Sequence, residues 1–321
     1  MNHNSRLGSI LNLLLMICCY GLGPVSDDPL SSELVREQKD RGLSLVSVFA
    51  GRVYSVDFST RSLGVAEDHQ IEGNSEFGIV SPDATLIALV NNTNLNLRIS
   101  MLDGSGSQNY TELKSPSGMC WSNNNAKLAL TANHARTDGQ TPITFQIMDL
   151  ESRKTEIVDD MNAFAMPQCW SPDGTLLVYS KNSVPNKQTV LTFNTQTKKK
   201  TELAAGAYAT WIPTTDWITF LDCGVEGHDC TFYAIHPDGT GKRALFKTFA
   251  AITGLSWSPD GRFGAYVSAT RTSEREEASW RLRVRRLQDN AEDWVANLTD
   301  TDPNEFQWTT DKGLLPQSTT K

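Results

Sequence analysis

The residue types that carry out acid–base, nucleophilic or metal chemistry are thinly spread along this chain. No G-x-S-x-G nucleophile elbow occurs, and the serine-rich stretch "GSGSQ" (104–108) reads as a polar hairpin turn. The sequence contains neither a C-x-x-C motif nor a neighbouring pair of histidines, so it does not indicate a zinc site. The five histidines fall mostly in turn-like stretches at unrelated positions, namely His3, His69, His134, His228 and His236. We interpret them as loop residues and predict no catalytic residue, no cofactor and no metal ligand.

Four of the six cysteines lie beyond the first 26 residues. Cys223 and Cys230 flank "GVEGHD", a glycine-containing loop between two strand-like runs, where a disulfide is geometrically easy. Cys120 and Cys169 each precede a tryptophan at matching positions of a repeat. We predict a disulfide between Cys223 and Cys230. For Cys120 and Cys169 we expect two small buried residues, with a bridge between them as the alternative.

Three aspartates occupy the same position of "SPD" turns, namely Asp83, Asp173 and Asp260. Calcium needs six to eight oxygen ligands that converge on one point. A side chain that hydrogen-bonds the backbone of its own turn cannot also converge with others on a shared ion. We therefore interpret these aspartates as structural turn residues.

Three arginines alternate along one predicted strand: Arg281, Arg283 and Arg285. Alternation places them on one face, with Leu282 and Val284 on the other. One interpretation is a solvated face with salt bridges to nearby acidic residues. The other is a contact patch for an acidic partner, and these arginines are the candidate partner patch that the sequence offers.

A sequence repeat predicts the strands and turns that position these residues. "QCWSPDGTLLVYS" (168–180) returns as "LSWSPDGRFGAYVS" (255–268), and six copies of this strand–turn–strand phrase can be aligned. They are spaced 41 to 51 residues apart, with anchors at Val80, Trp121, Trp170, Trp211, Trp257 and Trp308. A period of this length, with a second hairpin after each copy, is typical of one four-stranded propeller blade per repeat.

The turn of the phrase has a definite chemistry. Pro172 presets φ for the first turn position, Asp173 can bond neighbouring amides, and Gly174 tolerates positive φ. The second copy has "NNN" (123–125) instead, and asparagine is the next-best residue for left-handed geometry. The turn is therefore predicted to persist although its letters change.

The two ends of the repeat region complement each other. Residues 43–66 supply three strands without an opening phrase, and Trp308 ends an opening strand without partners. Pairing the C-terminal strand with the N-terminal strands closes a ring and removes the exposed edges. We predict an all-β fold: a six-bladed β-propeller of four-stranded antiparallel blades over residues 43–315.

The phrase also carries a family resemblance. "WSPDG" (170–174), "LDGSG" (102–106), "HPDGTGKRALF" (236–246) and "NLTDTDPNEFQW" (297–308) resemble the WD40-like Pro-Asp repeats of TolB-like β-propellers. The resemblance covers nearly all of the chain after its first residues, but only the propeller part of that family. It implies a periplasmic protein of a cell-envelope complex that binds a protein partner. TolB itself carries an α/β domain ahead of its propeller, whereas about 20 residues stand there in this sequence.

Composition and the N-terminus bound the class of protein. A net charge of −8 argues against a nucleic-acid partner. The apolar run at 10–23 predicts a signal peptide over 1–26, with an uncleaved anchor or a lipid-modified Cys18 or Cys19 as alternatives. We expect a linker at 27–42, a tail at 316–321, no membrane span in the mature form, and a monomer exported to the periplasm or secreted.

These observations lead to two function hypotheses from different classes. The first is an exported, non-catalytic propeller that serves as a protein–protein interaction scaffold at the cell envelope. The second is a hydrolase or lyase that uses a metal bound in the propeller channel. Convergence of three or more carboxylate, histidine or asparagine side chains on one point would favour the second.

Overall fold

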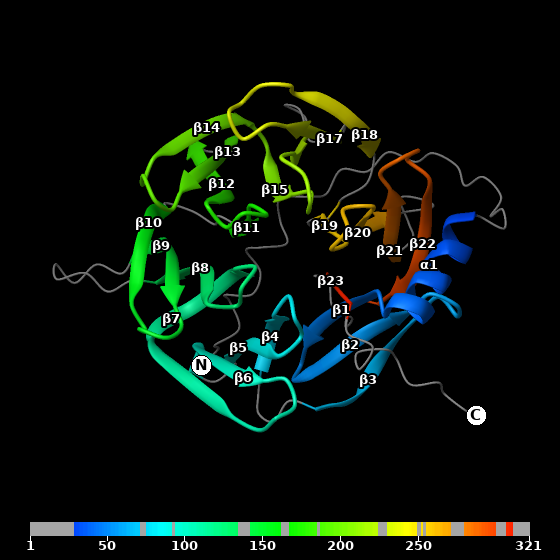
Figure 1. Cartoon of the computed structure of the whole chain (residues 1–321), viewed down its shortest axis with the longest axis horizontal. Coiled ribbons are helices and arrows are strands. Elements are labelled where there is room, and N and C mark those ends of the chain that lie inside the picture. Colours follow the sequence, from blue (N-terminus) through cyan, green and yellow to red (C-terminus); the bar gives the residue numbers. More distant parts are fainter. Residues whose placement is uncertain are drawn as a thin grey trace, which may run out of the picture.

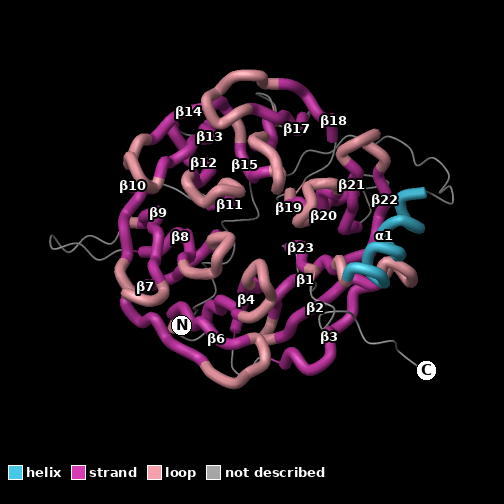
Figure 2. The backbone as a smooth tube through the Cα atoms, in the orientation of Figure 1, coloured by secondary structure: helices cyan, strands magenta, loops and turns pink. Residues whose placement is uncertain are grey.

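The fold is known from a computed structural model, which describes residues 29–70, 75–91, 94–133, 142–161, 167–184, 187–223, 230–248, 252, 255–270, 279–299 and 306–310. The predicted signal peptide (1–26) and tail (316–321) lie outside these residues. Within the described part of the chain the structure is almost entirely strand and turn, with one helix at the edge of the ring (Figure 2).

The strands form four antiparallel sheets arranged in a ring, which is the architecture of a β-propeller (Figure 1). Three sheets have four strands each. The first contains β11 (Pro167–Trp170), β12 (Leu176–Val184), β13 (Lys187–Asn194) and β14 (Lys200–Ala205), and the second contains β15 (Ala207–Trp211), β16 (Ile218–Asp222), β17 (Cys230–Ile235) and β18 (Arg243–Thr248). The third contains β19 (Ser256–Trp257), β20 (Phe263–Thr270), β21 (Ser279–Arg286) and β22 (Glu292–Leu298).

The fourth sheet has eleven strands in the order β10-β9-β8-β7-β6-β5-β4-β1-β2-β3, with β23 (Gln307–Thr309) also paired to β1. Its remaining bounds are β1 (Ser44–Phe49), β2 (Arg52–Asp57), β3 (Ser62–Gln70), β4 (Ser75–Val80), β5 (Leu86–Asn91), β6 (Asn96–Met101), β7 (Ser107–Trp121), β8 (Lys127–Asn133), β9 (Ile143–Asp149) and β10 (Thr155–Met161).

The number of sheets differs from the sequence prediction, which expects six separate blades. The first residues of β7 pair with β6, while Cys120 and Trp121 near its end pair with β8. One continuous strand thereby joins two repeats. Two residue pairs between β1 and β4, Val48↔Gly78 and Phe49↔Phe77, join the first strands, β1–β3, to these two repeats. The first half of the ring is therefore one continuous sheet.

Each anchor of the repeat lies where the sequence predicts it. Five anchors end an innermost strand, and the sixth lies in β23; they are Val80, Trp121, Trp170, Trp211, Trp257 and Trp308. Two of the tryptophans also hydrogen-bond to the preceding repeat. Trp121 donates its indole N–H to the carbonyl of Ile79 at 3.2 Å, and Trp308 donates to Ser256 at 3.1 Å. In both pairs the acceptor immediately precedes the anchor of the previous repeat.

The C-terminal strand closes the ring, as the sequence predicts. β23 pairs antiparallel with β1, and Trp308 lies opposite Leu45. Trp308 is 7% exposed and packs near Phe58 and Phe263, with ring centroids 6.0 and 6.2 Å away. Residues from the first and last repeats thus share one core.

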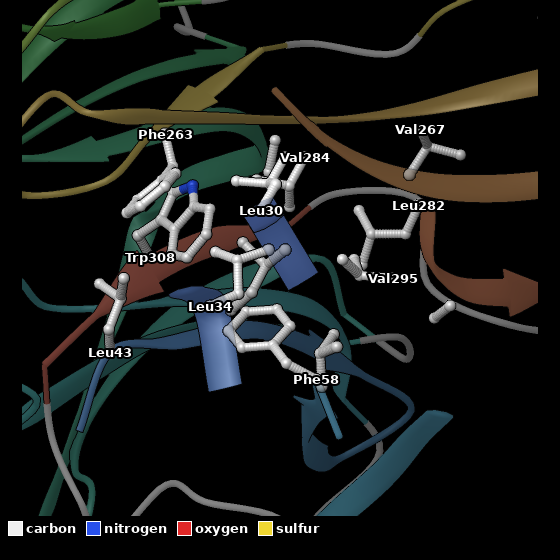
Figure 3. Packing of buried hydrophobic residues seen from close by; sticks show 14 of the residues in the cluster. Leu30, Leu34, Leu43, Phe58, Phe263, Val267, Leu282, Val284, Val295 and Trp308 are labelled. Atoms are coloured by element: carbon white, nitrogen blue, oxygen red, sulfur yellow. The ribbon is translucent and has the colours of Figure 1, made fainter. Parts of the chain in front are cut away.

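Helix α1 (Pro29–Arg41) stands where the sequence prediction places a linker. Leu30 and Leu34 are fully buried in the cluster around Trp308 (Figure 3). A linker prediction is natural because this stretch has few apolar residues. The i, i+4 spacing of its two leucines is enough to stabilise a helix here, because the ring supplies apolar residues for both leucines to pack against.

Candidate functional site

The turns that follow the innermost strands gather about the centre of the ring (Figure 2). In the β11–β12 turn, Ser171 donates its hydroxyl to Asp173 at 2.5 Å and accepts the amide of Leu176 at 2.9 Å. The same pattern recurs in three other turns, with the trios Ser81/Asp83/Leu86, Ser122/Asn124/Lys127 and Ser258/Asp260/Phe263. The predicted turn role of the three aspartates is confirmed.

This geometry keeps the turn aspartates ionised. Hydrogen bonds from Ser171 and from the backbone amide of Thr175 hold the pKa of Asp173 below its ordinary value. The carboxylate oxygens of Asp173 are engaged by their own turn. Such a group is suited to fixing the backbone and is poorly suited to protonating a substrate near neutral pH.

Neighbouring turns also contact one another. Asn123 donates its side-chain amide to the carbonyls of Ser171 and Pro172, at 2.9 and 3.0 Å. Gly261 approaches Pro213 so closely that a Cβ atom at this glycine would lie 2.7 Å from the Pro213 carbonyl oxygen. These contacts join two pairs of neighbouring turns. We call the turns that follow the innermost strands the rim.

A pocket of 380 Å³ opens at this rim, where the first and last repeats meet. Five parts of the chain build it: the end of α1, the residue before β1, the turn before β16, the turn before β20, and the residue after β23. The lining residues are Glu37, Arg41, Leu43, Thr214, Pro259, Asp260 and Thr310. Five of the seven lining residues are polar or charged, and Leu43 and Pro259 are the apolar ones.

The charged groups at the pocket are paired with each other. Arg262 contacts Glu37 and Asp260 at 2.9 and 2.7 Å, and Arg41 contacts Glu37 at 3.2 Å. Burial alone would raise the pKa of Glu37, but the bonds from Arg262 and Arg41 outweigh it and lower that pKa. Ion pairs therefore border the pocket near neutral pH, and Arg41 is the exposed member of the network.

The three arginines of the predicted partner patch lie on one face of β21, with Leu282 and Val284 buried on the other. Arg283 and Arg285 both donate to Glu292 of the adjacent strand, the first at 2.9 Å. Arg281 lies over the ring of Trp294, 5.7 Å from its centroid. The internal ion pairs favour the interpretation as a solvated face with salt bridges. Contact of Arg281, Arg283 and Arg285 with a partner stays a prediction.

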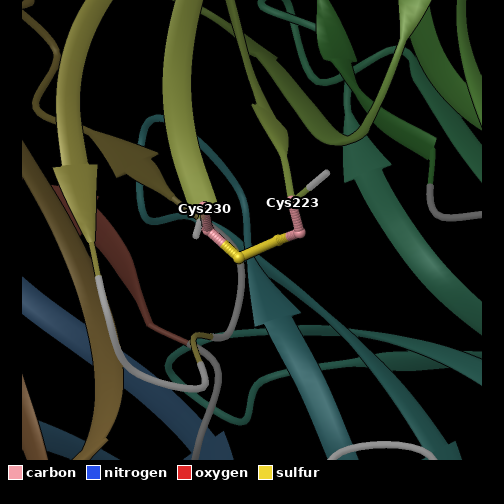
Figure 4. The surroundings of a disulfide bond; sticks show 2 residues. All are labelled: Cys223 and Cys230. Carbon is pink, nitrogen blue, oxygen red and sulfur yellow. A yellow bond between two sulfur atoms is a disulfide. The ribbon is translucent and has the colours of Figure 1, made fainter. Parts of the chain in front are cut away.

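The predicted disulfide is present: Cys223 is joined to Cys230 at the β16–β17 connection (Figure 4). Cys120 is buried and donates its thiol to the carbonyl of Trp121 at 3.5 Å, in agreement with a packing role. Cys169 lies in β11, one residue before Trp170 as its position in the repeat requires.

The described residues contain no group of three or more histidine, cysteine, aspartate or glutamate side chains arranged to hold a metal ion. Across the same residues no helix combines the length and apolar character that crossing a membrane requires.

Sequence reasoning missed the pocket. Two of its residues, Glu37 and Arg41, lie in the predicted linker, and Thr214 and Thr310 lie in turn-like stretches without a motif. The i, i+4 series Glu33, Glu37, Arg41 was the available signal, since it places three charges on one side of a helix.

No protein-family model matches this sequence, and no curated protein matches it. Solved structures share its fold at low identity. A putative TolB from Agrobacterium tumefaciens has a TM-score of 0.60 and 16% identity, over 80% of this chain and 89% of that one. TolB from Acinetobacter baumannii has a TM-score of 0.62 and 15% identity, over 84% and 67%. An oligogalacturonate lyase in complex with manganese has a TM-score of 0.54 and 13% identity, over 82% of each chain.

Proposed function

We propose that this chain is an exported, monomeric, non-catalytic propeller that binds a protein partner on the face formed by the rim turns. The observation that carries the proposal is the state of the rim. Its turn carboxylates are committed to their own serines and amides, and neighbouring turns contact each other at two junctions. A rigid surface of this kind binds without a large ordering cost.

Two further features support the proposal. The pocket at the rim offers a recess for a partner side chain, between apolar and ion-paired walls. The disulfide between Cys223 and Cys230 is typical of an oxidising compartment and supports export. Two solved structures similar in fold are TolB proteins, which agrees with a scaffold at the cell envelope.

We also propose that the ring counts six blades. The eleven-stranded sheet divides into three groups of the same composition as the separate sheets, if β7 serves as the last strand of one group and the first of the next. The groups are β23 with β1–β3, β4–β7, and β7–β10. Six repeat anchors support this division.

The binding proposal can be tested with two tryptophan variants. Thr310→Trp places a large side chain at the pocket, while Thr197→Trp adds the same bulk at an exposed turn between β13 and β14. Each protein, purified after export, is immobilised and used to capture partners from envelope extracts. A protein retained by wild type and Thr197→Trp but lost from Thr310→Trp is then purified and titrated calorimetrically.

The expected result is saturable one-to-one binding that Thr310→Trp weakens at least tenfold. Equal retention by all three proteins would place the partner elsewhere and contradict the proposed face. Turnover of an acidic polysaccharide in the presence of a divalent metal ion would contradict the non-catalytic function. The fold shared with a manganese-bound lyase makes that assay a necessary control.

A further inference from the structure

The direct pairing that closes the ring is short. β23 and β1 share three residue pairs, Ser44↔Thr309, Leu45↔Trp308 and Val46↔Gln307. By comparison, β20 and β21 share eight. Ladder bonds over three pairs give little resistance to opening, because each net hydrogen bond contributes about 1 kcal/mol.

We call the junction between the first group of strands (β23 with β1–β3) and the last sheet (β19–β22) the seam. Helix α1 bridges it and buries its apolar side against both flanks. Leu30 and Leu34 are fully buried in one cluster with Val56 and Phe58 from the first repeat and Val284 and Val295 from the last. Figure 3 shows the two leucines between Phe58 on one side and Val284 on the other. The two flanks therefore share an apolar core that α1 completes.

Polar contacts of α1 also reach both flanks. On the first repeat, Gln38 donates its side-chain amide to the carbonyl of Val56 at 2.6 Å and accepts the amide of Phe58 at 3.2 Å. Gln38 is 8% exposed, so these bonds are shielded from water.

On the last repeat, Glu33 contacts Arg262 at 2.9 Å and Arg286 at 2.5 Å. The Glu33 side chain is 15% exposed, and the arginines come from β20's preceding turn and from the end of β21. A carboxylate shared by two guanidinium groups anchors the helix more firmly than a single exposed pair.

We propose that α1 is the clasp of the ring: α1, more than the β1–β23 pairing, holds the first and last repeats together, and the seam opens only when α1 leaves. The same event would remove Glu37 and Arg41 from the wall of the rim pocket. The clasp therefore controls the shape of that pocket.

Hydrogen exchange of the full chain, followed by mass spectrometry, tests the clasp with three variants. Leu34→Ala removes apolar contact from the seam, and Leu128→Ala removes the same group from a fully buried position in another cluster. Glu33→Gln keeps the shape of the side chain and removes its charge. The readouts are exchange in peptides that contain 44–46 and 307–309, and in peptides from β15–β18.

We expect Leu34→Ala and Glu33→Gln to speed exchange at 44–46 and 307–309 at least tenfold and threefold, with β15–β18 unchanged. Leu128→Ala should leave the seam near the wild-type rate. Faster exchange confined to α1 would overturn the proposal, as would equal acceleration at the seam by Leu128→Ala. If Leu34→Ala fails to fold, Glu33→Gln decides by the same criteria.

Discussion

Asp159 offers the sharpest test of how adjacent sheets are held together. It lies on β10 of the eleven-stranded sheet, and its side chain is 9% exposed. It accepts bonds from the Tyr179 hydroxyl and the Lys181 ammonium, both at 2.9 Å, and contacts Lys200 at 3.1 Å. All three partners belong to the next sheet along the chain. We therefore predict that Asp159→Asn destabilises the protein through this junction.

The magnitude follows from the exposure of the partners. Breaking a fully buried ion pair costs about 3–5 kcal/mol, because the remaining charge stays desolvated. Lys181 and Lys200 are 27% and 39% exposed, so their ammonium groups can turn to water. The substitution mainly removes the strength that the carboxylate charge adds to these hydrogen bonds, about 1.5–3 kcal/mol in all. We expect Asp159→Asn to lower the free energy of unfolding by about 2 kcal/mol at pH 7.

The stability difference between wild type and Asp159→Asn should depend on pH, and the pKa of Asp159 gives the direction. Burial alone would raise the pKa of Asp159, but bonds from Lys181, Tyr179 and Lys200 outweigh it and lower that pKa. A carboxyl whose folded pKa is depressed contributes stability that is full above its unfolded pKa of about 4 and is lost as the pH falls through its folded pKa. The difference between wild type and Asp159→Asn should therefore shrink in acid.

Urea unfolding monitored by fluorescence at pH 7 and again in acid measures both effects. Glu151→Gln, a charge removal at an exposed turn, is the matched control and should lie within about 0.5 kcal/mol of wild type. The reasoning is refuted if Asp159→Asn matches that control at pH 7. It is also refuted if the full deficit persists in acid.

Three further predictions concern the turns, the disulfide and the packing. Ser171→Ala should cost about 1–2 kcal/mol in thermal unfolding, because an amide and Asp173 lose their partner; a wild-type melting temperature would contradict the turn role. Reduction of the Cys223–Cys230 bridge, whose cysteines are 7 residues apart, should cost about 2–3 kcal/mol, measured as urea midpoints with and without reductant; coincident midpoints would count against a bridge in solution. Gly78→Ala should cost about 1–3 kcal/mol by urea unfolding, since the added Cβ would lie 2.5 Å from a backbone oxygen, whereas Gly106→Ala has room; equal stability of the two would disprove the clash.

The innermost strands and their turns could be predicted because they are specified locally. A tryptophan, a Ser-Pro-Asp turn and an alternating strand follow one another within about a dozen residues, as at Trp170 and Trp257. Ring closure could be predicted as well, because strands are missing at both ends in complementary numbers. The continuity of β7 could not, because a turn-like Ser-Pro-Ser-Gly stretch (115–118) separates its two halves.

The rim pocket and helix α1 depend on contacts between residues that are far apart in the sequence. Glu33 meets Arg286 across 253 positions, and nothing near either residue indicates the other. The common face of Arg281, Arg283 and Arg285 on β21 could be assigned. Glu292, the acceptor that Arg283 and Arg285 share, could not. Alternation specifies which side a residue occupies and leaves its neighbours across the sheet open.

The backbone shape of the rim turns does not depend on the charge of the residue that caps them. Asn124 accepts a bond from Ser122 and one from the amide of Ala126, the same service that Asp173 performs with Ser171 and Thr175. A neutral amide and a carboxylate are thus interchangeable at this position without a change of backbone. Exchange of Asp for Asn at this position in related chains would change the charge of the rim one repeat at a time, and so its choice of ligand, without a change of backbone.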